Sequence, residues 1–254
     1  MHEVIWNSKK ISEFWTNNDL LIARGIKEND YFGEIYSPAI LDILNEKVCF
    51  RNKKVLDYGC GVGSLIKRLL EDYKPELVMG CDLSEESCNE TDKRCIKFKS
   101  YKGSFNINEN EIKKYENFFD CVLLSEVIEH LDDETLKYVI NNITRMLRPN
   151  GIICITTPND EELSLSLAIC PDCGCYFHRH QHIRSWNKNS LTQFMTVSNY
   201  VLIETLQSSL KRRNTPLRKL YSRLYDIIAP KFGRKLIDLF WIGKKISDNQ
   251  NEKD

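Results

Sequence analysis

The stretch from Val55 to Ser64, VLDYGCGVGS, places one acid and three glycines directly after a short apolar run. Its G-x-G-x-G spacing differs from the G-x-G-x-x-G of dinucleotide-binding proteins, which need no acid before the glycines. Glycines at such a turn let the backbone bend tightly and approach a ligand closely. In open α/β sheets, ligands bind beyond the carboxyl ends of the strands. The stretch therefore predicts a strand, a ligand-binding turn and a helix, in that order.

The chain around this turn alternates short apolar runs with amphipathic stretches. Apolar runs bounded by turn signals predict strands over 53–59, 76–82, 95–103, 119–125, 151–157, 200–207 and 236–245. Helical periodicity predicts helices around 11–15 and over 38–48, 65–73, 85–94, 111–116, 136–147 and 187–195. Strands that alternate with helices require a mostly parallel sheet covered on both faces. The sequence therefore predicts an α/β fold.

Length and composition narrow the classes of protein. The chain has 254 residues, which suits one α/β domain with additions. Lys plus Arg and Asp plus Glu are 36 each, so there is no overall basic field of the kind that holds a general nucleic-acid binder. No export signal and no bilayer-spanning apolar run is visible. Most of the ten cysteines lie in apolar segments, which favours reduced thiols and a cytoplasmic location.

Three parts are expected along the chain. Residues 1–50 form an N-terminal helical cap, 51–245 the α/β domain, and 246–254 a frayed polar tail. Within the domain, 160–186 is rich in Cys and His. Residues 211–235 hold nine Lys or Arg and one acid, Asp226, beside one apolar face. Such a basic amphipathic helix packs on a sheet edge with its charges solvated, lies on an anionic membrane surface, or receives an anionic substrate.

Further motifs follow the glycine turn in a fixed order: VMGCDLS, FDCVLLSEVIEHL, MLRPNG and ICITTPN. Together with VLDYGCGVG they resemble the class I S-adenosylmethionine-dependent methyltransferases over residues 53–159. The resemblance implies a Rossmann-like, seven-stranded, mostly parallel sheet with an antiparallel last strand and helices on both faces. The Cys/His-rich segment is then an insertion after the fifth strand, on the substrate side of the cleft.

The resemblance also implies a cofactor site. Asp57, Gly59, Gly61 and Gly63 are expected to line the methionine moiety of S-adenosylmethionine, and Asp82 to hold the ribose hydroxyls. Ser104 and Phe105 are expected near the adenine. The full set of cofactor-binding candidates is Asp57, Gly59, Cys60, Gly61, Gly63, Asp82, Leu83, Ser104, Phe105, Ser125 and Glu126.

The motif SEVIEHLDD begins at the end of the fourth expected strand, at the same edge of the sheet. Glu126, Glu129 and His130 stand at i, i+3 and i+4, which predicts one helical turn that carries all three. Such a group can bind a divalent cation or supply a general base to a hydroxyl. Ubiquinone-type O-methyltransferases resemble this stretch, and small-RNA-terminal 2′-O-methyltransferases combine a similar one with a later histidine. The same letters also occur in class I enzymes without a known metal.

The tract CPDCGCYFHRHQH, residues 170–182, allows three interpretations. Cys170, Cys173, His178 and His182 have spacings that suit a structural zinc site. Alternatively, the tract is a reduced cap over the cleft, anchored by Trp186. In the third interpretation its histidines face Glu129 and His130, and His180 or His182 acts as a general base. With FH-x-x-Q-H-x-R-SW it resembles uncharacterised bacterial methyltransferases linked to surface-polysaccharide and lipid-linked pathways.

Together these features predict an S-adenosylmethionine-dependent methyltransferase that O-methylates a hydroxylated small molecule or a glycan or lipid-linked precursor. The expected catalytic residues are Glu129, His130, His180 and His182. The expected cofactors are S-adenosylmethionine and zinc or another divalent metal. One alternative is a metal-dependent RNA ribose 2′-O-methyltransferase. Another is an inactive, cofactor-binding partner protein with a zinc knuckle.

Overall fold

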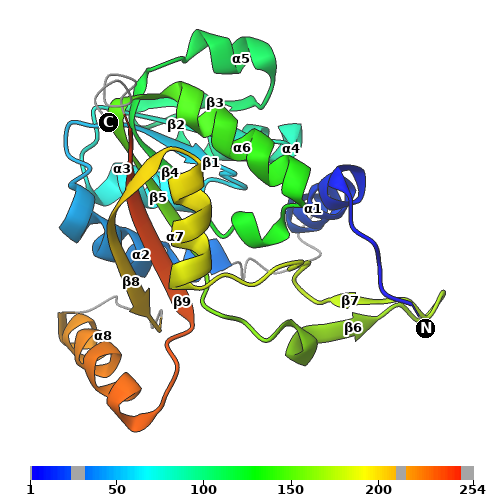
Figure 1. The fold of residues 1–254 in the computed structure, drawn as a ribbon. Helices are drawn as coiled ribbons and strands as arrows, with labels where there is room; N and C mark the ends of the chain where they lie inside the picture. Colours follow the sequence, from blue (N-terminus) through cyan, green and yellow to red (C-terminus); the bar gives the residue numbers. More distant parts are fainter. Residues whose placement is uncertain (1, 24–31, 210–215, 247–254) are drawn as a thin grey trace.

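The computed structural model describes residues 2–23, 32–209 and 216–246. Its main sheet contains the strands β1 Lys54–Tyr58, β2 Leu77–Asp82, β3 Tyr101–Asn106, β4 Phe119–Ser125, β5 Leu147–Pro158, β8 Tyr200–Ser208 and β9 Asp238–Lys245. The α-helices are α1 Ser8–Ala23, α2 Phe32–Val48, α3 Ser64–Asp72, α4 Glu85–Cys95, α5 Glu109–Lys114, α6 Asp133–Met146, α7 Lys188–Val197 and α8 Pro216–Ile228. Figure 1 shows how they surround the sheet.

The seven strands lie in the order β3-β2-β1-β4-β5-β9-β8. β3, β2, β1, β4 and β5 pair in parallel, whereas β9 is antiparallel to both β5 and β8. The expected mostly parallel sheet with an antiparallel last strand is therefore confirmed. Parallel pairing brings the carboxyl ends of β1, β2 and β4 to one edge, where the glycine turn and the acidic loop begin.

Two apolar clusters sandwich the sheet because successive strand side chains point to opposite faces. Along β1, Leu56 packs with residues of α5, α6 and α7, whereas Val55 packs with residues of α2, α3 and α4. Within the segment that was predicted as an N-terminal helical cap, α2 thus covers a face of the sheet. Only α1 lies over the carboxyl edge, where it lines the cavity described below.

Two strand predictions were wrong at their boundaries. The third strand begins at Tyr101 rather than at residue 95, because α4 continues to the buried Cys95 and the lysine-rich stretch after it forms a turn. β5 already begins at Leu147 rather than at residue 151, so Pro149, Asn150 and Gly151 lie within the strand and do not precede it. A register shift against β4 accommodates these residues, since Phe119 pairs with Leu147 and Cys121 with Ile152.

Residues 160–186 leave the sheet after β5 and form a short 3-10 turn, η2 Leu163–Ser166, and a two-stranded hairpin, β6 Leu167–Ile169 and β7 Tyr176–His178. The chain's N-terminal segment lies alongside this hairpin (Figure 1). Tyr176 pairs with Glu3 there.

The basic segment contains α8 and a 3-10 turn, η3 Ala229–Phe232. The carboxylate of Asp226 accepts hydrogen bonds from Ser208 Oγ at 2.6 Å and Ser209 N at 3.0 Å, which fixes the helix at the end of β8. The expectation that the apolar face of α8 packs on the sheet edge was wrong, since Leu217 is 80% exposed. Other exposed apolar residues of α8 are Leu220, Tyr221, Leu224, Ile227 and Ile228.

Within the described residues, no helix is both long and apolar enough to cross a membrane. The predicted tail lies outside the described residues beyond Ile246.

Candidate active site

A cavity opens at the carboxyl edge of the sheet and is covered by α1. Its empty volume is about 880 Å³, the open mouth included. Gly59, Gly61 and Asp82 line it from the ends of β1 and β2, and Glu126 and His130 line it from the loop after β4. Trp15 of α1 lines the same cavity. The fold thus places the glycine turn and the acidic loop around one space.

The glycine turn depends on glycine at two positions. Gly59 and Gly63 have φ angles of 81° and 78°, in the left-handed region. A Cβ atom at Gly59 would lie 2.7 Å from Cγ2 of Val127, and one at Gly63 would lie 2.8 Å from Oγ1 of Thr91. The turn can therefore pass between its neighbours only with bare backbone.

Asp82 ends β2 with its carboxylate held by backbone groups. Gly61 N donates to Oδ2 at 2.9 Å, and Ser84 N donates to Oδ1 at 3.0 Å. Burial raises the pKa of Asp82, and these hydrogen bonds counteract the rise. The glycine turn and Asp82 therefore form one linked unit at the cavity wall.

The motif SEVIEHLDD is a loop and not the predicted start of a helix. Glu126 has a φ of 54°, and only Ile128–His130 form a single 3-10 turn, η1. α6 begins later because Asp132 caps it, accepting a hydrogen bond from Thr135 N at 2.8 Å. The i, i+3, i+4 argument was thus wrong for Glu126, although Glu126 still lines the cavity.

Three candidate ligand groups meet beside the cavity. Ligand atoms of Glu129, His130 and His182 all lie within 4.8 Å of one another. His182 comes from the Cys/His tract, 52 residues after His130 in the chain, and their rings are 4.9 Å apart. Trp15 packs edge-on against His130 with ring centroids 4.6 Å apart. Of the three histidines in the tract, His182 therefore lies beside Glu129 and His130, as the third interpretation expects.

Two acceptor atoms face each other in this group. The His130 ring nitrogen Nδ1 lies 3.4 Å from the carbonyl of Gln181, to which it can donate, so Nε2 keeps its lone pair. Nε2 lies 3.7 Å from Oε1 of Glu129, too far for a hydrogen bond. Oε1 is buried, and no group in the described part of the chain forms a hydrogen bond with it. Burial lowers the pKa of His130 to about 3, so the imidazole is neutral. A buried carboxylate oxygen beside an imidazole lone pair is the environment that a cation satisfies.

His182 is oriented by Glu161 in the segment after β5. Its Nδ1 lies 2.5 Å from Oε2 of Glu161. His178 supports the same carboxylate, with Nε2 3.5 Å from Oε1 of Glu161, and its Nδ1 accepts from His182 N at 3.1 Å. A carboxylate behind a histidine is the usual arrangement around metal-ligating imidazoles. His180, by contrast, is exposed, and its ring lies 5.9 Å from those of His178 and His182.

The predicted zinc set of Cys170, Cys173, His178 and His182 is not brought together. Among the described residues, the two cysteines group with Cys175, whereas the two histidines group with Glu161. The reason is the hairpin: β7 runs from Tyr176 to His178 and carries the histidines away from the cysteine turn. The spacing of the four residues in sequence did not reveal this strand.

Comparison with known families identifies the family of the chain. The family described as a methyltransferase domain matches residues 31–205, more than half of the chain. The chain belongs to this family. The resemblance to class I S-adenosylmethionine-dependent methyltransferases is therefore confirmed, and S-adenosylmethionine is the cofactor of the family.

Individual methyltransferases differ in how much they share with this chain. The ubiquinone biosynthesis O-methyltransferase of Pelagibacter ubique (strain HTCC1062) is 31% identical over 119 residues, which are 47% of this chain and 48% of that enzyme. The matched region thus spans about half the length of that relative.

Two solved structures share the fold. The 1,6-didemethyltoxoflavin-N1-methyltransferase of Burkholderia thailandensis, solved with 1,6-didemethyltoxoflavin and S-adenosylhomocysteine, has a TM-score of 0.65 at 15% identity, covering 96% of this chain and 93% of that one. The methyltransferase domain of bacterial CtHen1-C has a TM-score of 0.56 at 19% identity, covering 85% of this chain and 100% of that one. At these identities the likeness concerns the fold alone.

The residues of this methyltransferase domain suit its family's cofactor. Asp82 offers a carboxylate for hydroxyl groups, and Leu83, Ile107 and Val127 add apolar wall for a flat ring. The bare backbone of Gly59 leaves room where a side chain would collide. Of the predicted cofactor residues, the cavity is lined by Gly59, Gly61, Asp82, Leu83 and Glu126.

The other predicted cofactor residues do not line the cavity: Asp57, Cys60, Gly63, Ser104, Phe105 and Ser125. Ser104 Oγ donates to the carbonyl of Cys88, and Phe105 stacks on Tyr115. Because β3 continues to Asn106, the residue that follows it into the cavity is Ile107. Sequence reasoning also missed Trp15, whose only signal was an aromatic position on the first helix. Correct placement of the third strand would have found Ile107.

We expect Gly63→Ala to lower the free energy of unfolding by more than Gly233→Ala does. Both glycines have left-handed φ angles, but no atom of the described residues lies within 4 Å of a Cβ built at Gly233, whereas Thr91 blocks one at Gly63. Strain alone costs about 1–2 kcal/mol, and overlap with Thr91 adds to it only at Gly63. Chemical denaturation of both variants measures the difference. Equal losses of unfolding free energy in the two variants would show that the turn at Gly63 relaxes without cost.

We expect Asp57→Asn to stabilise the cofactor-free protein at pH 8 but not below pH 4. Burial, and then repulsion by Asp82, raise the pKa of Asp57 from 3.8 to about 7. The folded protein holds this proton more tightly than the unfolded chain, so stability falls as pH rises from 3.8 to about 7. Asparagine removes that loss. The melting temperatures of the wild-type protein and of Asp57→Asn across this pH range test the prediction. Parallel dependence of the two melting temperatures on pH would contradict it.

Proposed function

We propose that the protein transfers the methyl group of S-adenosylmethionine to a hydroxyl of a small-molecule acceptor or of a glycan or lipid-linked precursor. Gly59 and Gly61 would cradle the cofactor, and Asp82 would hold its ribose hydroxyls. Bound S-adenosylmethionine supplies an electrophilic methyl group. The protein's main task is then to align the acceptor and to remove its proton.

The convergence of Glu129, His130 and His182 carries this proposal. One carboxylate and two imidazoles form a ligand set that suits divalent transition metals. Such an ion would satisfy the buried Oε1 of Glu129, which has no partner in the structure. A bound divalent ion lowers the pKa of a coordinated hydroxyl, and a hydroxyl must lose its proton to accept a methyl group. Glu161 would hold His182 in the orientation that ligation requires.

The setting of the three ligands supports their role near an acceptor. His130 lines the cavity that also holds the glycine turn and Asp82. Gln181 Nε2 donates to the carbonyl of His130 at 3.0 Å, and Trp15 Nε1 donates to Oε1 of Gln181 at 2.7 Å. α1 thereby closes over this end of the cavity, where it would exclude water from the transfer. The O-methyltransferase name of the Pelagibacter relative agrees with a hydroxyl acceptor.

Neither alternative function is favoured. The RNA alternative rests on E-x-x-E-H together with a later histidine, and the position of His182 beside Glu129 and His130 fits it as well. The balanced charge of the chain, however, gives no broad attraction to phosphates. An inactive partner protein would not need the oriented Glu161–His182 pair beside the cavity.

Labelled S-adenosylmethionine tests the acceptor class directly. The purified protein is incubated with quinone precursors, glycan extracts and RNA, with and without added divalent metal. We expect metal-dependent label on a hydroxyl of a small molecule or glycan. Label found only on RNA, or on nitrogen or carbon, would overturn the proposal.

We also propose a reducing cytoplasm as the location of the protein. All ten cysteines are free thiols, as a reducing compartment requires.

We further propose that α8 docks on an anionic membrane surface. α8 exposes Leu217 and Leu220 together with other apolar side chains, and Arg223, Lys231 and Arg234 are exposed close by. Apolar residues on an exposed helix, with basic residues on it and on the turn that follows, suit the interface of an anionic bilayer.

A flotation assay tests the docking proposal. We expect the protein to float with vesicles that contain phosphatidylglycerol and not with pure phosphatidylcholine vesicles. The double change Leu217→Glu and Leu220→Glu should abolish flotation, because it places charge in the apolar face. Ile96→Glu is the matched control, since Ile96 is also exposed but lies after α4. Unchanged flotation of the double variant would contradict the proposal.

A further inference from the structure

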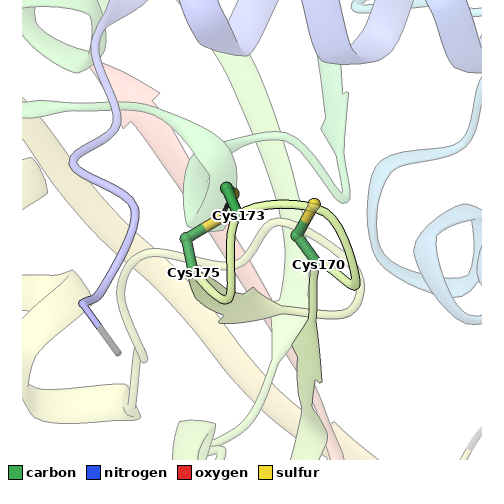
Figure 2. A group of neighbouring side chains, drawn as sticks. All are labelled: Cys170, Cys173 and Cys175. Carbon is green, nitrogen blue, oxygen red and sulfur yellow. Dashed lines mark hydrogen bonds between the residues drawn. The ribbon is translucent and has the colours of Figure 1, made fainter.

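Three cysteines gather at the tip of the hairpin formed by β6 and β7. Figure 2 shows Cys170, Cys173 and Cys175 on the turn that joins the two strands. Their sulfur atoms all lie within 4.8 Å of one another, and Sγ of Cys173 is 3.1 Å from Sγ of Cys175. None of the three lines the cavity. This cluster is therefore separate from Glu129, His130 and His182.

The backbone of the turn is tight and ordered by its own hydrogen bonds. Cys170 N donates to the carbonyl of Cys175 at 2.8 Å, and Gly174 N donates to the carbonyl of Cys170 at 2.9 Å. Gly174 has a φ of 68°, which lets the chain reverse between the cysteines. The turn thereby holds the three sulfur atoms close together, as the turns of metal knuckles do.

The hairpin has little apolar packing between its own two strands. Its strands are three residues each, and an isolated two-stranded hairpin is at best marginally stable in water. Leu165, Leu167 and Ile169 are all exposed rather than buried beneath it. Small structures without a core are usually held by a disulfide or a metal ion.

We infer that Cys170, Cys173 and Cys175 form a zinc site that holds the hairpin closed. Thiolates are soft ligands that select zinc over magnesium or calcium, and three of them on one turn leave a fourth tetrahedral position for a water molecule or another small ligand. Binding releases the thiol protons as the metal–sulfur bonds form, with no change in oxidation state. The site uses a different ligand set from the one that spacing predicted, and it does not depend on the proposed acceptor chemistry.

The hairpin is connected to the cavity through the N-terminal segment. Tyr176 N, directly after Cys175, donates to the carbonyl of His2, and Val4 N donates to the carbonyl of Tyr176, both at 3.0 Å. Trp6 packs against Phe177 of β7, with ring centroids 6.3 Å apart. The zinc site thus anchors the segment that leads into α1.

Aromatic contacts continue this connection along α1 to the active site. Trp6 packs on Phe14 with centroids 5.7 Å apart, Phe14 packs on Trp15 at 5.4 Å, and Trp15 packs on His130. A hairpin held by zinc would therefore keep α1 in place over the cofactor cavity. Loss of the ion should loosen this cover.

Cobalt substitution tests the site, because only sulfur ligands give an intense thiolate-to-cobalt charge-transfer band. The protein is purified under reducing conditions, stripped with a chelator and titrated with Co²⁺, then with Zn²⁺. We expect the band to appear at one equivalent and to disappear when Zn²⁺ displaces Co²⁺. Ions at Glu129, His130 and His182 give no such band, so failure of the proposed active-site metal leaves this result unaffected.

Two variants complete the test. Cys173→Ser should abolish the band, and folding is checked by circular dichroism, which the exposed position of Cys173 should leave unchanged. Cys49→Ser should retain the band, because Cys49 is an equally exposed cysteine at the end of α2. Absence of the band in the wild-type protein, or its persistence in Cys173→Ser, would overturn the zinc site.

The connection to α1 has its own measurement. We expect removal of zinc to weaken the binding of S-adenosylhomocysteine roughly fivefold, the scale of ordering one or two side chains on binding. Readdition of zinc should restore affinity in the wild-type protein and not in Cys173→Ser. Equal affinities with and without zinc would show that the ion serves the hairpin alone.

Discussion

Glu129→Gln should slow methyl transfer by roughly 10²–10⁴-fold, which is the scale of losing proton removal from the acceptor. The affinity for S-adenosylhomocysteine should stay within roughly twofold of wild type, because the change affects the chemical step and not the binding of the cofactor. Glu129 is 1% exposed, and its buried Oε1 has no hydrogen-bond partner among the described residues. Glutamine has nearly the same shape but no charge, so it removes the anionic ligand and leaves the packing in place. Thr157 Oγ1, which donates to Oε2 at 3.0 Å, keeps an oxygen acceptor in the amide.

Two measurements separate this role from a merely structural one. Single-turnover rates with labelled cofactor report the chemistry, and metal content of the purified protein reports ligation. We expect Glu129→Gln to lose both the rate and the ion, and Glu134→Gln to lose neither, because Glu134 is an exposed residue in the first turn of α6. A variant that keeps its full rate would refute the role of Glu129. Loss of cofactor affinity along with rate would indicate a general distortion of the cavity.

Asp82→Ala should weaken S-adenosylhomocysteine binding by roughly 100-fold or more, since hydrogen bonds to a charged group contribute about 1.5–3 kcal/mol each. Asp82 lines the cavity, and its oxygens already accept from Gly61 N and Ser84 N. Removing the carboxylate therefore takes away both the ribose acceptor and the group that orders the glycine turn. Isothermal titration calorimetry measures the affinity.

The matched control for Asp82 is Asp120→Ala at the opposite edge of the sheet. Asp120 also accepts from a backbone group, Lys54 N at 2.8 Å, but it lies near the amino end of β4. We expect Asp120→Ala to cost stability and to leave cofactor affinity unchanged. Asp82→Asn, which keeps one acceptor oxygen, should bind with intermediate affinity. Wild-type affinity in Asp82→Ala would remove Asp82 from the cofactor site.

Much of the cofactor end of the cavity could be predicted from local sequence. The acid, the glycines and the strand before them lie within ten residues, and the second strand ends at Asp82 as expected. The third strand was displaced because Ile96 and Phe98 look like strand residues among lysines. In the structure Ile96 is exposed and the pairing with β2 begins only at Tyr101. Because of that shift, Ser104 and Phe105 were expected near the adenine, whereas the residue that follows β3 into the cavity is Ile107.

The group of Glu129, His130 and His182 could be predicted only as one of several alternatives. Glu129 and His130 are neighbours in sequence, but whether His182 joins them depends on a loop of more than twenty residues after β5. Ile183 N donates to the carbonyl of Glu129 at 2.9 Å, and this contact brings His182 beside Glu129 and His130. The cysteines instead remain at the hairpin tip, where Cys175 replaces the histidines as their partner.

The sequence by itself determined the family, the sheet and the glycine turn, because these depend on periodicity and on contacts between residues close in the chain. The tertiary structure alone decided which way the histidines face, which cysteines group together and that α1 covers the cavity. Each of these rests on contacts between segments far apart in sequence, such as Trp15 with His130 and Tyr176 with His2. Spacing carries no information about such contacts, since the path of the intervening chain sets them.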